Sequence, residues 1–103
     1  MVISDLLGPF RDAMTLRNER TRRAYLADLR AVCAWYETSY GAPLTLDALT
    51  QDAVSRYRHW CGVRVRAGTF NRRKAALASF CRWAVREGLL PSSVVKGVAC
   101  LKP

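Results

Sequence analysis

Apolar side chains in this chain recur at intervals of three and four residues, which places them along one side of an α-helix. The longest such stretch predicts a helix from Glu19 to Tyr40, begun by Asn18 or Thr21 as the N-cap and ended by Gly41. Its expected buried stripe comprises Tyr25, Leu29, Val32, Tyr36 and Tyr40. No alternating run is long enough for a sheet, so we predict an all-α protein.

Two shorter helices follow from the same spacing. One is expected from about Ser4 to Met14 with Ser4 as its cap, and a start only at Pro9 is the alternative, because Gly8-Pro9 disfavours the middle of a helix. Another is expected from Gln51 to about Val63, with Thr50 as its cap. Residues 44–49 connect the long helix to this one and have room for a helical turn.

A fourth long helix is predicted from Phe70 to Glu87, with Thr69 as its cap and Gly88 after its end. The tail from Ser92 has room for one more short helix. At 103 residues the chain is expected to be one domain, residues 1–101, with residues 102–103 beginning a linker. The residues expected to be buried between the two long helices are Leu29, Val32, Tyr36, Leu77, Phe80 and Trp83.

Positive charge is concentrated in the second half of the chain. The formal net charge is +9, and no acidic residue occurs between Asp52 and Glu87. That interval contains Arg56, Arg58, Arg64, Arg66, Arg72, Arg73, Lys74, Arg82 and Arg86. Such a stretch favours a polyanionic partner, because a clustered positive surface releases counterions from phosphates. The alternatives are an arginine-rich surface without a ligand and, less favoured, a basic membrane-binding helix, since no broad apolar face lies opposite the arginines.

The sequence does not indicate a membrane-spanning, secreted, metal-binding or catalytic protein. No apolar run approaches the roughly 20 residues of a membrane span, and the first residues do not resemble a signal peptide, so we expect a cytoplasmic protein of bacterial, archaeal or phage origin. The cysteines, Cys33, Cys61, Cys81 and Cys100, form no CxxC pair, and His59 is the only histidine. We therefore expect no metal and no other cofactor, small buried cysteines, a structural or exposed His59, and no catalysis by these residues.

Two expected helix starts are rich in cations. Thr69 and Asn71 precede Arg72, Arg73 and Lys74, and Asn18-Glu19-Arg20-Thr21-Arg22-Arg23 repeats the arrangement at the first long helix. Cations are unfavourable near the positive end of a helix dipole, so another demand is expected to place them there. Backbone amides and guanidinium groups together suit phosphate, although a solvated helix start without a ligand is the alternative.

Three segments in this order resemble the SAM-like, core-binding N-terminal domain of the tyrosine recombinases, which include phage integrases. They are Thr21 to Leu29 with Tyr25 and Asp28-Leu29, then Leu49 to Val54, then Thr69 to Leu90 with Asn71-Arg72, Ala76-Leu77, Phe80, Trp83-Ala84 and Arg86-Glu87-Gly88. Ser93-Val94 departs from the family's usual Asn-Pro. The resemblance implies a SAM-like bundle of four main helices plus a possible short C-terminal helix.

The resemblance also implies a function. The domain would close on double-stranded DNA opposite a C-terminal catalytic domain, in which the nucleophilic tyrosine lies, and would contact other protomers in a synaptic tetramer. The catalytic residues would then lie outside these 103 residues, and Tyr25, Tyr36, Tyr40 and Tyr57 would not be nucleophiles. The residues expected to contact DNA are Thr21, Arg22, Arg23, Thr69, Asn71, Arg72, Arg73 and Lys74, followed by Arg30 and Arg82. Arg64 and Arg66 are expected on a loop without a phosphate contact.

Two other functions remain open. A helix-turn-helix regulator is also small, helical and basic, but it joins two short helices through a tight turn. A SAM-like protein-interaction module without DNA is the third reading. A steep salt dependence of duplex binding would separate DNA binding from that module.

Overall fold

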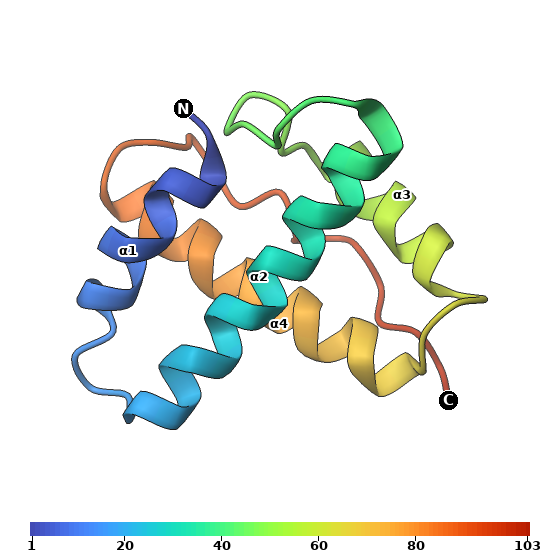
Figure 1. Ribbon diagram of the computed structural model, residues 1–103, viewed down its shortest axis with the longest axis horizontal. Coiled ribbons are helices and arrows are strands. Elements are labelled where there is room, and N and C mark those ends of the chain that lie inside the picture. The colour runs from blue at the N-terminus through green and yellow to red at the C-terminus, as the bar shows by residue number, and fades with distance from the viewer.

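The computed structural model describes all 103 residues as four α-helices without a β-strand (Figure 1). The helices are α1 (Ile3–Ala13), α2 (Glu19–Tyr40), α3 (Gln51–Cys61) and α4 (Ala67–Arg86). Helices α2 and α4 cross each other and form the centre of the bundle, with α1 on one side and α3 on the other (Figure 1). The predicted all-α fold with four main helices is confirmed.

The predictions for α2 and α3 hold at the N-terminal ends of these helices. The Asn18 side chain accepts a hydrogen bond from the backbone N–H of Thr21 at 2.8 Å, which caps α2. The Thr50 hydroxyl accepts one from the N–H of Ala53 at 3.1 Å, which caps α3. Gly41 ends α2 with φ of 72°, a left-handed conformation that glycine adopts without steric cost.

The helix predicted from about Ser4 to Met14 is present as α1 to within one residue at each end, but the predicted Ser4 cap and the alternative start at Pro9 are wrong. This helix begins at Ile3, continues through Pro9 and has Val2, without any side-chain cap, at its N-cap position; Ser4 is its second residue. The reason is a tertiary contact: the N–H of Ile3 donates to the carbonyl of Leu44 at 2.9 Å, and Val2 pairs with Thr45 in an isolated antiparallel bridge. A distant segment therefore fixes the first turn and replaces the cap.

The predicted cap of α4 is also wrong. The helix begins at Ala67, Arg66 occupies the N-cap position without a side-chain hydrogen bond, and Thr69 lies within the first turn. The connection before it is thus limited to residues 62–66. Arg66 stands at the helix start, and Arg72 lies one turn deeper in the helix than expected.

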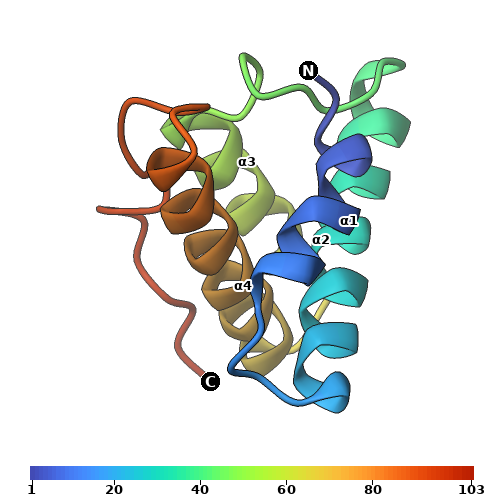
Figure 2. The same ribbon diagram turned by 90° about the vertical axis from the view of Figure 1, so that its left-hand side faces the viewer.

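No helix forms in the tail after Gly88, so the possible short C-terminal helix is absent from the structure. Val95 and Val98 are buried, and the last residues run alongside α4 (Figure 2). Their backbone bonds to side chains of the bundle: Arg58 donates to the carbonyls of Ala99 at 2.8 Å and Cys100 at 3.1 Å. These hydrogen bonds hold the segment in a non-helical conformation, because its carbonyls bond to Arg58 and not to backbone N–H groups of a helix.

The core largely matches the prediction. Five of the six residues expected between the long helices are buried, and the sixth, Tyr36, is half-buried. The expected stripe of α2 is rotated, because Tyr40 is 46% exposed whereas Leu26 and Trp35 are buried. Phe10, Tyr57, Phe70 and Phe80 are fully buried aromatic residues that join the four helices in one core.

The cysteines differ from the expectation in one case. Cys61 and Cys81 are buried, and Cys33 is half-buried with the pKa of its thiol raised to about 11 by desolvation. Cys100 is exposed on the tail, which lies on the surface of the bundle. None of the four helices combines the length and the hydropathy that a membrane-spanning helix requires.

Candidate nucleic-acid interface

The start of α2 is held in place by Arg22. Its Nη1 donates to the carbonyls of Met14 at 3.2 Å and Arg17 at 3.0 Å, and its Nη2 donates to the Glu19 carboxylate at 3.0 Å. Arg22 thereby connects α2 to the end of α1. The backbone N–H of Thr21, another predicted DNA contact, is occupied by the Asn18 cap, and its side chain is half-buried.

Two predicted DNA contacts on α4 form hydrogen bonds within the protein. The Asn71 side chain donates to the carbonyl of Leu101 at 2.9 Å and accepts from its N–H at 2.8 Å, which fixes the tail. Arg73 Nη1 donates to the Tyr57 hydroxyl at 3.0 Å, while its buried Nε has no partner. Burial raises the pKa of that Tyr57 hydroxyl to about 12, so it stays protonated and accepts from Arg73 through its lone pair.

Lys74 lies next to these residues. Its Nζ is 3.6 Å from the exposed Cys100 Sγ, and the side chain has no carboxylate partner. Arg73 and Lys74 thus reach α3 and the tail, respectively, from consecutive positions on α4.

Arg72 makes a different contact, with α2. Its Nε lies 3.1 Å from both carboxylate oxygens of Asp28, and its Nη2 lies 3.0 Å from Asp28 Oδ1. Asp28 is 3% exposed, the one polar or charged residue in the buried set, whereas the Arg72 side chain is 61% exposed. This carboxylate raises the pKa of Arg72 by hydrogen bonding and charge attraction, so the guanidinium remains charged.

Three further predicted residues are exposed. Arg23 is 78% exposed and has only a long ion pair of 3.8 Å with Glu19, and Arg30 lies two turns further along α2. Arg82 lies on the second half of α4, where it lines a groove of about 460 Å³ with Arg17, Arg86 and Ser79. No acidic residue lines that groove.

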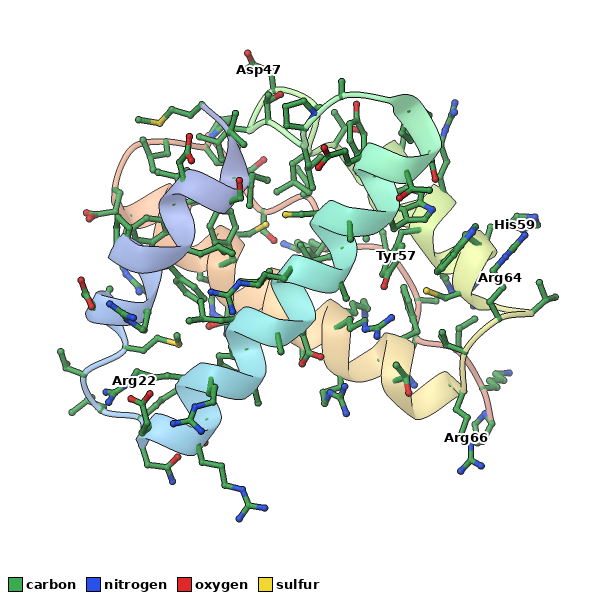
Figure 3. All side chains as sticks on the ribbon, in the orientation of Figure 1. Arg22, Asp47, Tyr57, His59, Arg64 and Arg66 are labelled. Carbon is green, nitrogen blue, oxygen red and sulfur yellow. The ribbon has the colours of Figure 1, made fainter.

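The two basic helix starts lie at the same end of the molecule. Both views place the first turns of α2 and α4 at the lower end, together with the C-terminus (Figures 1 and 2). Figure 3 shows Arg22 and Arg66 along this edge, and Asp47 at the opposite one. We name this surface the basic end, defined by its exposed cations Arg20, Arg23, Arg66, Arg72 and Lys102.

An open hollow of about 640 Å³ lies at the α4 side of the basic end. Arg66, Thr69, Arg72 and Lys102 line it with Ala67, Gly68 and Pro103, and no Asp or Glu side chain is among them. Arg66 has no side-chain hydrogen bond, and the amides of Ala67 and Gly68 belong to the open first turn of α4. Cations and a helix start with free backbone N–H groups therefore border the same space, an arrangement suited to phosphate oxygens.

Two residues of this surface and one residue behind it were not predicted from the sequence. The sequence predicts Arg66 on a loop without a phosphate contact and Lys102 in a linker, although both line the hollow. Asp28 is part of the family pattern without an expected role, yet it is the buried carboxylate that binds Arg72. An acidic residue next to Leu29, on the buried side of a helix, is a signal that could have indicated a buried ion pair.

Residues outside this surface show no catalytic or metal-binding arrangement. His59 is exposed and points away from the bundle (Figure 3). No three His, Cys, Asp or Glu side chains come together as a metal site requires. Tyr57 is buried in the core, so its hydroxyl cannot reach a substrate in this conformation.

Residues 13–88 match the family model described as "Phage integrase, N-terminal SAM-like domain". The chain is 42% identical over 78 residues to "Tyrosine recombinase XerC" of Mycobacterium bovis (strain BCG / Pasteur 1173P2), covering 72% of this chain and 24% of the relative. The protein of the same name from Mycobacterium sp. (strain JLS) is 41% identical over 81 residues, with 74% and 25% covered. The chain thus spans about a quarter of the length of these relatives. No solved structure matches it.

Proposed function

The chain belongs to the family of phage integrase N-terminal SAM-like domains, and we propose that it binds double-stranded DNA through the basic end, as the DNA-binding module of a site-specific tyrosine recombinase. The observation that carries the proposal is the placement of two helix starts along one edge of the bundle, α2 at the lower left and α4 at the lower right of Figure 1. Because α2 and α4 begin far apart in the sequence, their cations share a surface only in the folded protein.

Electrostatics favour a phosphate backbone as the ligand of this surface. Each phosphate that is neutralised releases condensed counterions, so several exposed cations on one face bind duplex DNA without reading its sequence. The hollow at the start of α4 adds backbone donors and the positive end of a helix dipole. Base contacts in the major groove would then come from side chains further along the helices.

The predicted site residues divide into two groups in this proposal. We assign direct DNA contacts to the accessible residues Arg23, Arg30, Thr69, Arg72 and Lys74. Arg82, on the second half of α4, is assigned a contact of lesser weight. The other four, Thr21, Arg22, Asn71 and Arg73, hold the helix starts and the tail in place through their hydrogen bonds within the protein.

For the whole protein we propose the recombinase clamp. The DNA would lie between this domain, residues 1–101, and a C-terminal catalytic domain reached through a linker that begins at residues 102–103. Lys102 and Pro103 line the hollow at the basic end, so a linker that begins with them would leave this domain beside the bound DNA (Figure 1). Contacts with other protomers would build a synaptic tetramer, in the cytoplasm and on the nucleoid of a bacterial cell.

Titration of the ¹⁵N-labelled domain with a short duplex at low salt tests the DNA-binding proposal. We expect amide shifts concentrated in residues 19–23 and 66–74, which disappear as salt is raised. A titration without any amide shift would contradict DNA binding and favour the protein-interaction module. Shifts in α3 and the first turns of α4, without any shift in residues 19–23, would favour the helix-turn-helix reading.

A further inference from the structure

The carboxylate of Asp28 occupies one edge of the Arg72 guanidinium. A guanidinium group has five N–H donors in a plane and offers two edges to planar oxyanions, the side edge of Nε and Nη2 and the outer edge of Nη1 and Nη2. Asp28 takes the side edge, with all three contacts between 3.0 and 3.1 Å. Nη1 makes no hydrogen bond within the protein, and Nη2 uses only one of its two hydrogens for Asp28, so the outer edge keeps donors for a ligand.

The free edge belongs to a side chain that reaches the basic end. Arg72 is 61% exposed despite its contact with a buried carboxylate, and it lines the hollow that Arg66, Thr69 and Lys102 also line. A buried carboxylate must be paired to be stable, so this contact persists in the folded state. The Arg72 side chain is therefore held in one orientation, with donors left over for a ligand.

We propose that Asp28 is a positioning residue for DNA binding, which fixes the Arg72 guanidinium so that its outer edge receives a backbone phosphate. This inference rests on the proposed function. A free arginine loses rotamer freedom when it binds, at a cost of about 0.5–1.5 kcal/mol, whereas Arg72 has already lost that freedom in the folded protein. Asp28 thus strengthens binding to a polyanion although it carries the same sign of charge as the ligand.

This proposal predicts a change in DNA affinity for Asp28→Asn opposite in direction to the change expected from net charge. Replacing Asp28 with Asn raises the net charge from +9 by one, so diffuse electrostatics predicts tighter binding to DNA. Loss of the fixed orientation predicts weaker binding, by about three- to tenfold. Asp47→Asn is the matched control, because Asp47 is exposed, makes no ion pair and lies at the opposite edge of the molecule (Figure 3).

The experiment measures the affinity of the wild-type chain, Asp28→Asn and Asp47→Asn for one fluorescent duplex at fixed salt. Circular dichroism at the same temperature shows that each variant is folded, which separates affinity from stability. The Nε–Hε resonance of Arg72 reports the orientation of its guanidinium. We expect this resonance to be separate from those of the exposed arginines in the wild type, and to shift to the same region of the spectrum as theirs in Asp28→Asn. If Asp28 contributes only to stability, folded Asp28→Asn should bind the duplex more tightly than the wild type, as its higher net charge predicts.

Arg72→Lys provides a second variant if Asp28→Asn does not fold. It keeps the charge but replaces the two-edged group with a single ammonium, which cannot hold both a carboxylate and a phosphate in fixed directions. We expect a similar three- to tenfold loss, and little further loss when the two substitutions are combined. Wild-type affinity in Arg72→Lys would overturn the proposal.

The outcomes distinguish this inference from the proposed function. Weaker binding by Asp28→Asn, with equal or tighter binding by Asp47→Asn, supports the positioning role. Equal tightening in both variants overturns it and leaves the DNA-binding proposal intact. No binding of the duplex by the wild-type chain overturns both proposals.

Discussion

Replacing Arg20 and Arg66 together with Ala removes one exposed cation from each helix start of the basic end. Neither side chain makes an ion pair, and Arg66 does not cap α4 through its side chain, so the fold should be unaffected. The net charge falls from +9 by two. The substitution therefore tests whether these particular positions contact phosphates.

The size of the effect follows from the number of contacts. If the five exposed cations of the basic end each neutralise one phosphate, the logarithm of the binding constant falls against log salt with a slope of about −4 to −5, at roughly −0.9 per contact. Losing two contacts should flatten the slope by about two units. Fluorescence anisotropy of a labelled duplex across a series of salt concentrations gives both slopes.

The control is the double variant Arg86→Ala with Lys96→Ala. Both side chains are exposed and unpaired; Arg86 is the last residue of α4 and Lys96 lies in the tail after it, away from the basic end. This pair also lowers the net charge by two, and we expect it to change the slope by less than about one unit. Equal flattening by the two double variants would show that diffuse charge binds the DNA, and the reasoning from the helix starts would fail.

Three predictions concern stability. Leu77→Ala, at a site 1% exposed, should lower the free energy of unfolding in urea by about 2–5 kcal/mol, and a loss below about 0.5 kcal/mol would contradict its place in the core. Asn18→Ala should cost about 1 kcal/mol in the same assay because it removes a cap, whereas Thr69→Ala should cost less than about half of that, since Thr69 caps nothing. Burial raises the pKa of Tyr57 from 10.0 to about 12, so its contribution to stability is complete below pH 10 and is lost as pH rises through about 12; Tyr57→Phe should remove this loss, and an unchanged pH profile would contradict it.

Local sequence determined most of the helices. The caps of α2 and α3 were predicted because Asn18 and Thr50 act on backbone groups three residues away, within reach of any chain in that conformation. The all-α class followed from helical spacing, and the resemblance to the tyrosine recombinases followed from three segments in order. Both were confirmed. Local rules failed at α1, whose first turn depends on Leu44.

The sequence also placed cations at two helix starts, but it could not assign their roles. Arg72 and Arg73 are neighbours in the same basic run, yet one pairs with Asp28, 44 residues away, and the other donates to Tyr57, 16 residues away. Asn71 binds the tail 30 residues further on. Which polar atoms are satisfied inside the protein and which remain for a ligand depends on how the helices cross. Only the tertiary structure decided this, because the partners come from other helices and the tail.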